Sequence, residues 1–346
     1  MDGIEVRELL PSEYKEWDLL VEKAQPGTLF HTSEWLEICR DVLSKDLRIY
    51  GCFRNGELVG GCPLFVKNIK GVLKVASSTC KMTSYSGPLI KESASSRASK
   101  RIQETHEILN PLREFFCKQG FDSIHLTFAP GFEDIRPFTW NGWDSAVHYT
   151  HYLSLKENID GNLSGGRQME LKTATGAGLK TRVSNDPETY YRLLSLAYEK
   201  KNLEPPLPGG FYDRVFKLIQ KKSAGYMFVS ETPEGEAVAA HINLYGKKCA
   251  VIWTSALNPD FDRLGSNALL YYNEFLDLRS RNFEYMNLMA ANIPVFVDFI
   301  MGFSPELIPY YSVTLESKKY SAAKTLYKTT HKETYRWKNC IPLDRK

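Results

Sequence analysis

The pattern of apolar and polar positions predicts an α/β protein in which one order of elements occurs twice. In the first half, an apolar segment at 4–9 precedes the first helix, and Arg-Asn-Gly-Glu at 54–57 separates two apolar runs. Asn-Gly between apolar runs is a strong signal for a β-hairpin. The helices predicted here cover 12–24, a segment that opens at 30–35, and 96–119, and the strands cover 47–53, 58–66, 73–77 and 121–126.

The second half repeats this order of helices, hairpin, further strand, long helix and strand. The turn Pro-Glu-Gly-Glu at 233–236 takes the place that 54–57 has in the first half. The predicted helices of this half cover 187–200, 212–221 and 266–281, and the strands cover 226–230, 237–245, 249–255 and 283–288.

Two local correspondences favour an internal duplication. Gly-Glu-Leu-Val at 56–59 matches Gly-Glu-Ala-Val at 235–238, and both lie at a predicted hairpin. Phe-Asp-Ser-Ile-His-Leu at 121–126 matches Phe-Glu-Tyr-Met-Asn-Leu at 283–288, each directly after a long helix. The alternative is that hairpins and helix–strand steps recur by chance, as they do in any α/β protein.

The length of 346 residues favours two domains, because single hydrophobic cores rarely grow to that size. Between 155 and 186 the chain is rich in glycine, which marks this stretch as the junction. The expected boundaries are 1–155 for the first domain, 156–316 for the second, and 317–346 for a basic C-terminal helix or tail.

Composition and charge are those of an ordinary globular protein. Charged residues make up 25% of the chain, and the net charge of +3 is too small to indicate a nucleic-acid partner by itself. The seven cysteines include no Cys-x-x-Cys pair, which favours reduced thiols over disulfides or zinc. Residues 1–10 have no signal-peptide core, and no window is apolar enough to span a bilayer, so we expect a cytoplasmic protein without a bound metal.

Three motifs add a resemblance to a known family. They are the helix start Phe-x-x-x-x-Trp at 30–35, a basic helix at 166–174, and a strand with a Phe-Gly-type turn at 287–303. With the order of elements, they resemble the GNAT acetyltransferase fold in tandem, as in the FemABX-like superfamily and its BioF2-like acetyltransferase family. The resemblance spans about residues 4–315 and implies two GNAT-like domains, each a mixed, mostly antiparallel sheet flanked by helices.

The resemblance also implies a function. Its members suggest an acyltransferase that moves an acyl group from a thioester such as acyl-CoA to an amine of a sugar, an amino acid or a cell-envelope precursor. The family's late motif Phe-Lys-x-x-Phe-Gly has a lysine where this chain has Asp298. Because that lysine is associated with aminoacyl transfer, Asp298 disfavours the first alternative, an aminoacyl-tRNA-dependent FemX-like enzyme. The second alternative is a catalytically inactive tandem GNAT module that binds a ligand or partner.

In the GNAT fold, the donor's pyrophosphate lies at the N-terminus of the helix after the central strands, where free N–H groups and the helix dipole attract anions. In the second half, this helix opens at 262–268. Arg263 would supply charge, Gly265 would allow close approach to the backbone, and either Ser266 or Asn267 would cap the helix. The other interpretation is an ordinary capped helix. The corresponding first-half helix starts without a glycine, so the first domain is expected to bind no CoA.

Acyl transfer to an amine needs a proton acceptor and groups that hold the substrate. The candidate acceptors are His241, in an apolar strand, and Asp298, just after the last strand, and histidine has the more suitable pKa. Asn287, at the end of a strand, is a candidate for positioning the substrate. The competing interpretations are a hydrogen-bonded core histidine, a solvated loop acid, and an asparagine that bonds to a neighbouring loop.

The resemblance places the acceptor substrate between the domains. Arg167 and Lys172 would bind the phosphate of an acceptor such as a nucleotide sugar, with Arg40 facing them. Tyr310 and the aromatic pair at 211–212 would line the pocket. The alternatives are surface ion pairs for the three cations and core packing for the aromatic residues.

Near the C-terminus, four basic residues recur every four positions, which on a helix gives one cationic stripe. They are Lys324, Lys328, Lys332 and Arg336. The stripe would suit peripheral contact with an anionic membrane or with an RNA backbone such as that of tRNA. The alternative is the solvated face of a packed terminal helix.

Overall fold

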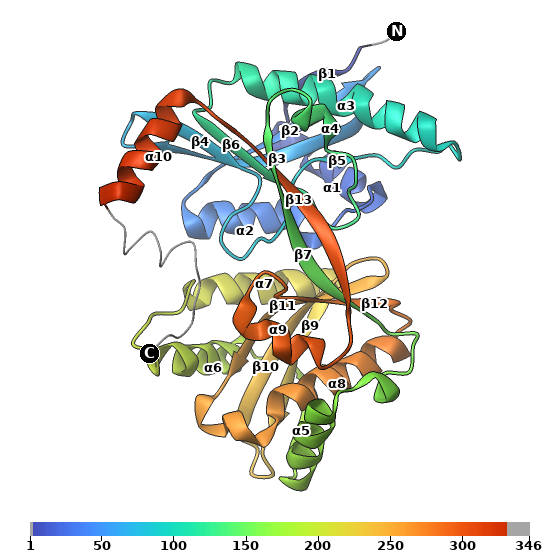
Figure 1. Ribbon diagram of the computed structural model, residues 1–346, viewed down its shortest axis with the longest axis vertical. Coiled ribbons are helices and arrows are strands. Elements are labelled where there is room, and N and C mark those ends of the chain that lie inside the picture. The colour runs from blue at the N-terminus through green and yellow to red at the C-terminus, as the bar shows by residue number, and fades with distance from the viewer. Residues whose placement is uncertain (1–2, 331–346) are drawn as a thin grey trace. The chain divides into compact units, whose positions relative to one another are not determined.

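The computed structural model describes residues 3–330, which fold into two compact units (Figure 1). Unit 1 contains the described residues up to His148 and those from Pro309 onward, and unit 2 is Tyr149–Ile308. In both units a mostly antiparallel sheet is flanked by helices, which confirms the predicted α/β class. Two strands, β7 (Asp144–Ser154) and β13 (Glu306–Glu316), contribute residues to both units.

The sheet of unit 1 has the strand order β1-β2-β3-β4-β6-β13, and β5 pairs with β3. All these pairs are antiparallel except β4 with β6. Besides β13, its strands are β1 (Glu5–Glu8), β2 (Asp46–Arg54), β3 (Glu57–Ile69), β4 (Leu73–Ser77), β5 (Leu89–Ile90) and β6 (Ser123–Thr127). Its α-helices are α1 (Tyr14–Lys23), α2 (Ser33–Leu43), α3 (Ala98–Lys118), α4 (Arg136–Thr139) and α10 (Lys318–Thr330), and its 3-10 helices are Pro11–Glu13 and Leu29–His31.

The predicted Asn-Gly hairpin is confirmed. It joins β2 to β3, and Arg54 pairs with Glu57 across the turn. Asn55 (φ 51°) and Gly56 (φ 80°) both have left-handed backbones. Two successive left-handed residues match the twist of a two-residue hairpin, which is why this dipeptide predicts one.

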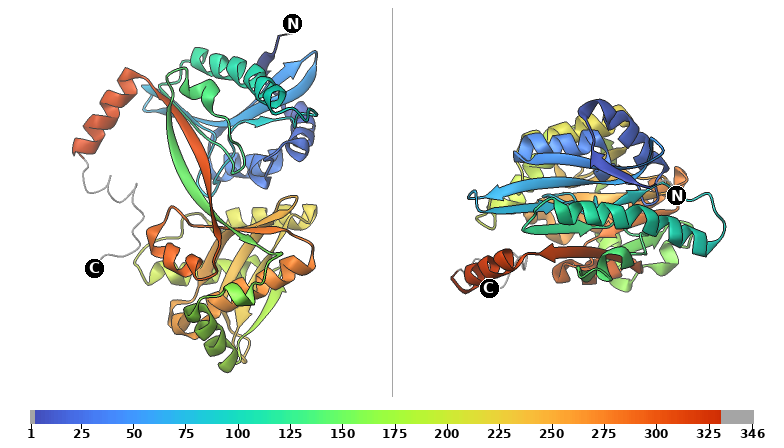
Figure 2. Two further views of the ribbon diagram at one scale, coloured as in Figure 1. Left: turned by 45° about the vertical axis from the view of Figure 1, so that its right-hand side comes forward. Right: turned by 90° about the horizontal axis from the view of Figure 1, so that it is seen from above.

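Helices cover both faces of the unit 1 sheet (Figure 2). A Cβ atom at Gly60 would lie 2.7 Å from Ile108 of α3, whereas one at Gly61 would lie 2.8 Å from Trp17 of α1. Because neighbouring strand residues point to opposite faces, α3 and α1 pack on opposite sides of β3. The paired glycines make room for these two side chains, both of which are buried.

The sheet of unit 2 has the strand order β7-β12-β11-β10-β9-β8, and only β11 and β12 are parallel. Besides β7, its strands are β8 (Lys180–Ser184), β9 (Gly225–Glu231), β10 (Ala237–Tyr245), β11 (Cys249–Leu257) and β12 (Tyr285–Met289). Its α-helices are α5 (Gly165–Gly176), α6 (Pro187–Glu199), α7 (Gly209–Lys222), α8 (Ser266–Ser280) and α9 (Pro294–Met301), and its 3-10 helices are Asp160–Asn162 and Pro259–Leu264.

Capping explains where one well-predicted helix begins. The backbone N–H of Glu188 donates to the side chain of Asp186 (3.0 Å), and Pro187 occupies the first helical position of α6. An aspartate cap followed by proline is a common helix start, because proline has no N–H that would remain unpaired. The helix predicted at 187–200 differs from α6 by one residue.

The division of the chain differs from the predicted boundaries of 1–155, 156–316 and 317–346 at its C-terminal end. After unit 2, β13 returns to unit 1, where Ser312–Glu316 pair with β6. Helix α10 then stays with unit 1, because Lys324 forms an ion pair with Glu316 (2.6 Å). Residues 309–316 therefore belong to unit 1 rather than to the second domain.

Candidate functional site

In unit 2, the parallel strands β11 and β12 pair over only three positions, from Cys249 with Tyr285 to Val251 with Asn287. Beyond Val251, β11 continues against β10, whereas β12 continues against β7 as far as Met289. The C-terminal parts of these two central strands therefore do not pair with each other. This interruption lies in the middle of the sheet, where a hydrogen-bonded ladder would otherwise be continuous.

Both strands are irregular at this point. Between Ile242 and Asn243 of β10, the register with β11 shifts, so that Trp253 is an extra residue on β11. Such a bulge leaves one residue out of the ladder and turns its neighbours. On β12 the register with β7 shifts after Asn287, and Met289 (φ 56°) and Ala290 (φ 57°) are both left-handed. Left-handed non-glycine residues are strained, and they cluster at functional sites.

Asn287, predicted to position a substrate, is fully buried and holds this strand end in place. Its Oδ1 accepts hydrogen bonds from the hydroxyl of Thr150 (2.6 Å) and from the backbone N–H of Met289 (2.9 Å). The second bond fixes the left-handed turn that follows β12. The structure therefore places Asn287 at the predicted strand end. Its side chain bonds to neighbouring groups of the protein, as the alternative interpretation expected.

His151, which the sequence reasoning missed, lies opposite Met289 on β7. Its Nδ1 is 3.3 Å from the carbonyl oxygen of Met289 and donates to it, which leaves the lone pair on Nε2. Burial lowers the pKa of His151 below its ordinary value, and the ring is accordingly neutral at pH 7. A histidine that points inward from a strand could have indicated this site. Because β7 was not predicted, His151 could not be placed on a strand.

The predicted donor loop lies at the start of α8, directly after β11 and the 3-10 helix Pro259–Leu264. Arg263 is exposed, Ser266 is buried and Asn267 is half-buried, and no side chain caps the helix. Gly265 has a left-handed backbone (φ 70°), and a Cβ atom there would lie 2.3 Å from the carbonyl oxygen of Glu170 in α5. The close approach that requires glycine is therefore that of α5, not the predicted approach of a phosphate.

His241, predicted as the proton acceptor, belongs to a buried polar network beneath α8. Its Nδ1 is 2.9 Å from Oε2 of Glu274, and its Nε2 is 2.8 Å from Oδ1 of Asn267. The other oxygen of Glu274 accepts from Nδ2 of Asn243 (2.9 Å). The side chains of His241 and Glu274 are fully buried. Both ring nitrogens of His241 are engaged, so neither is left to take a proton from a substrate.

The structure does not bring the other predicted site residues of unit 2 together as an anion site. The guanidinium of Arg167 lies 4.1 Å from the centre of the Phe299 ring and pairs with Glu170 (2.6 Å). Lys172 is exposed on α5. Asp298 is exposed as well and lies within helix α9 rather than in a loop. Arg167 is thus a packing residue, as expected of a cation held against an aromatic face.

In unit 1, Arg40 pairs with Glu37 (3.3 Å) and Asp41 (2.9 Å), which is the surface arrangement named as its alternative. Tyr310 stacks on His148, with ring centres 5.2 Å apart, and also packs against Tyr85. The aromatic pair at 211–212 in unit 2 is fully buried, so it belongs to the core.

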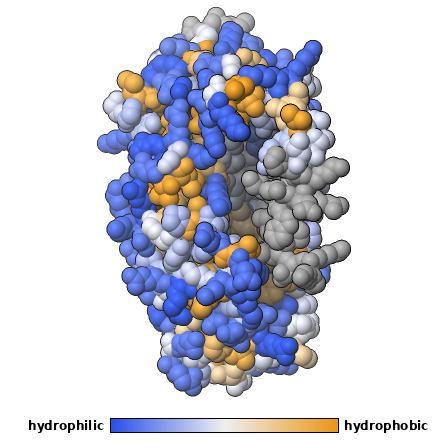
Figure 3. All heavy atoms as spheres, turned by 90° about the vertical axis from the view of Figure 1, so that its left-hand side faces the viewer, coloured by the Kyte–Doolittle hydropathy of each residue, from blue (hydrophilic) through white to orange (hydrophobic). Residues whose placement is uncertain are grey.

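The basic stripe is only partly described. Lys324 pairs with Glu316 on the preceding strand, as expected for the alternative of a packed terminal helix. The side chain of Lys328 and all of Lys332 and Arg336 lie outside the described residues. None of the described helices is long and apolar enough to cross a bilayer. On the face that Figure 3 shows, hydrophilic side chains predominate and hydrophobic ones form separate patches.

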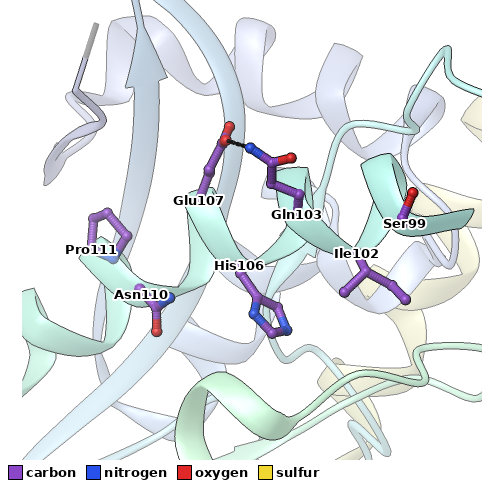
Figure 4. Close-up of a pocket in the computed structure, with 7 residues that line it drawn as sticks. All are labelled: Ser99, Ile102, Gln103, His106, Glu107, Asn110 and Pro111. Atoms are coloured by element: carbon purple, nitrogen blue, oxygen red, sulfur yellow. Dashed lines mark hydrogen bonds between the residues drawn. The ribbon is translucent and has the colours of Figure 1, made fainter. Parts of the chain in front are cut away.

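A hollow of about 570 Å³ runs along the outer side of α3 in unit 1 (Figure 4). Three of its polar side chains already have partners: Gln103 donates to Glu107 (2.9 Å), and His106 bonds to Asp134 (2.8 Å). The hollow is a shallow surface feature, and we do not take it as a candidate active site. In the described part of the chain, no three His, Cys, Asp or Glu side chains are grouped to hold a metal ion.

Comparison with known proteins agrees with the arrangement of unit 2. Residues 167–294 match the acetyltransferase (GNAT) domain family. The structure of FemX superposes with a TM-score of 0.68 at 10% identity, covering 94% of this chain and 99% of that chain. The chain has the tandem GNAT fold. FemX shares this fold, which agrees with the fold that the resemblance implied.

Two further solved structures share the tandem GNAT fold. L-PGS from Bacillus licheniformis has a TM-score of 0.60 at 14% identity, with 93% of this chain and 97% of that chain covered. A tandem GNAT protein from the clavulanic acid biosynthesis pathway has a TM-score of 0.51 at 12% identity, with 91% and 98% covered. None of the curated proteins compared matches the sequence.

Proposed function

We propose that the protein is an acyltransferase that takes an acyl group from acyl-CoA in unit 2 and passes it to an amine of a sugar, an amino acid or a cell-envelope precursor. The observation that carries this proposal is the loss of pairing between β11 and β12 after Val251 and Asn287, in the part of β11 that leads to the uncapped start of α8. An extended thioester arm would lie between the two strands. Its pyrophosphate would then meet the N–H groups and the positive dipole end of α8.

Unit 1 offers no equivalent donor site, because its own chain takes up the corresponding position. The parallel strands β4 and β6 also pair over three positions, from Val75 with Ser123 to Ser77 with His125. Beyond them, the backbone N–H of Ser78 donates to the carbonyl of His125 (2.9 Å), and that of Gly87 donates to Thr127 (2.8 Å). These bonds close the gap that stays open in unit 2. They support the expectation that only the second half binds CoA.

The donor site is tested by measuring CoA binding calorimetrically with Arg263→Ala. Arg263 is exposed at the start of α8, and losing one charge-assisted contact with a phosphate should weaken binding by about tenfold. The matched control is Arg279→Ala, which removes the same charge from the exposed far end of the same helix and should leave the affinity unchanged. An equal loss in both variants would contradict a phosphate site at the start of α8.

Absence of CoA binding by the wild-type protein at millimolar concentration would overturn the proposal as a whole. The next donors to test would then be aminoacyl-tRNAs, and after them the interpretation as a non-catalytic binding module.

Within this proposal, the proton acceptor is His151 rather than His241 or Asp298. The amine nitrogen attacks the thioester carbonyl, the new C–N bond replaces the C–S bond, and the amine proton passes to Nε2 of His151 before the leaving thiolate takes up a proton. Of the two histidines in unit 2, only His151 has a ring nitrogen without a partner among the described residues.

His151→Gln should lower acceptor-dependent release of CoA by about 100-fold, the lower end of the range for a lost general base. Because the variant keeps a polar side chain next to Met289, its affinity for CoA should stay at the wild-type value. Chromatographic detection of free CoA measures the rate without interference from protein thiols. An unchanged rate would remove His151 from the mechanism and leave the donor site as proposed.

A further inference from the structure

Unit 1 contains a second pocket, with a volume of about 430 Å³, beside the place where Ser78 and Gly87 close the gap between β4 and β6. It forms on one face of the sheet, between the end of α2, the loop after β4 and the start of α10. The strand register shows why side chains from three strands line the same face. Lys67 of β3 pairs with Val75 of β4, which pairs with Ser123 of β6, so all three side chains point the same way.

The charge of this pocket is one-sided. Lys45, Lys67 and Lys81 line it, and among the described residues that line it there is no Asp or Glu. None of these three lysines forms an ion pair within the described part of the chain. The nearest acid by strand register, Glu316 opposite Ser123, is already paired with Lys324 (2.6 Å).

Neutral hydrogen-bonding groups accompany the lysines. The hydroxyls of Ser77, Thr79, Ser123 and Tyr320 and the imidazole of His125 also line the pocket. Three lysines that line one pocket without a carboxylate give it a positive potential, which an anion that enters the pocket would neutralise. Several hydroxyl donors beside them suit a group with several acceptor oxygens, and phosphate is the common biological group of that kind.

We propose that this pocket binds the phosphate group of a small phosphorylated molecule. The volume exceeds what a phosphate group alone would fill, and Leu43, Phe65 and Val75 supply an apolar wall for the rest of the ligand. The site is separate from the CoA site proposed in unit 2 and does not depend on it. It would hold a phosphorylated acceptor or a regulatory metabolite of the same chemistry.

Cys80 provides a reporter inside the pocket. Its thiol lines the pocket and lies 3.3 Å from the hydroxyl of Thr83. A hydrogen bond with Cys39 lowers the pKa of Cys80, and the charge of Lys45 also acts in this direction, so the thiol is well suited to alkylation. Cys117 is exposed at the end of α3 and does not line the pocket, which makes it an internal control.

The experiment measures the rate at which iodoacetamide alkylates each cysteine, by peptide mass spectrometry, with and without inorganic pyrophosphate. We expect pyrophosphate to slow alkylation of Cys80 severalfold and to leave Cys117 unchanged. The double variant Lys67→Gln/Lys81→Gln should weaken the protection by about tenfold or more in pyrophosphate concentration, because it removes two charge-assisted contacts. Both lysines are exposed, so the variant is expected to fold.

Two control variants accompany the double variant. Lys100→Gln, an exposed lysine on α3, and Arg263→Ala in unit 2 should both retain full protection of Cys80. The last of these keeps a failure of the CoA proposal separate from a failure of this one. No protection at millimolar pyrophosphate, or equal protection in the double variant, would overturn the proposal. Protection by phosphatidylglycerol vesicles but not by pyrophosphate would overturn it in favour of contact with a membrane surface.

Discussion

Replacing Glu274 with alanine is expected to lower the free energy of unfolding by about 3–5 kcal/mol, the usual cost of removing one partner from a buried ion pair. The carboxylate is fully buried and bonds to both His241 and Asn243. Alanine removes the acceptor of both Nδ1 of His241 and Nδ2 of Asn243, and both of these residues are fully buried. Urea denaturation followed by tryptophan fluorescence measures the change.

The control for this prediction lies on the same helix. Arg279→Ala removes an exposed side chain from the last turn of α8 and should change the free energy of unfolding by no more than about 0.5 kcal/mol. A loss for Glu274→Ala as small as that of Arg279→Ala would show that the network contributes little to stability. The buried polar groups would then have to be retained for another purpose, such as holding Asn267 at the start of α8.

The elements that local signals specify were predicted well. The Asn-Gly turn has the left-handed residues that a two-residue hairpin requires, and α6 begins at its Asp-Pro cap. Helix α8 was also placed within one residue, because Gly265 and Ser266 mark its start. In each case the information lies within a few neighbouring residues. Local sequence therefore sufficed for the type and bounds of these elements.

Elements that depend on distant partners were not predicted. Strand β13 returns to unit 1 to pair with β6, and nothing near residue 312 indicates which strand it joins. Strand β7 and helix α9 were also missed, and Asp298 was therefore expected in a loop. An apolar eight-residue segment such as α9 is ambiguous between helix and strand from its periodicity alone.

The candidate site shows the same division. Sequence reasoning placed the start of α8 correctly, and its role as a donor loop stays a prediction. The partners of His241 could not be read from its own strand. Glu274 lies four residues from Leu270 and four from Leu278, both of which are buried on α8. An acid at a core position of a helix was thus a usable signal for a buried partner. What it pairs with depends on β10, which lies about 30 residues earlier in the chain.

Gly265→Ala is expected to lower the free energy of unfolding by about 3 kcal/mol, through two effects that add. Alanine in the left-handed region costs about 1–2 kcal/mol. In addition, the new Cβ would lie 2.3 Å from the carbonyl oxygen of Glu170, so α5 and α8 would have to move apart. Because α5 would be displaced from the start of α8, the affinity for CoA should fall in the same variant.

Gly235→Ala separates the two effects. Gly235 is also left-handed (φ 86°), but a Cβ atom there would have no neighbour within 4 Å, so only the backbone strain of about 1–2 kcal/mol applies. Denaturation of both variants gives the cost of the contact between α5 and α8 as the difference, and calorimetry with CoA should show a loss for Gly265→Ala alone. If the two variants are destabilised equally, the glycine is not needed for the approach of α5. A loss of CoA affinity confined to Gly265→Ala would then point to the close approach of a phosphate that was first predicted from the sequence, because displacement of α5 would not explain it.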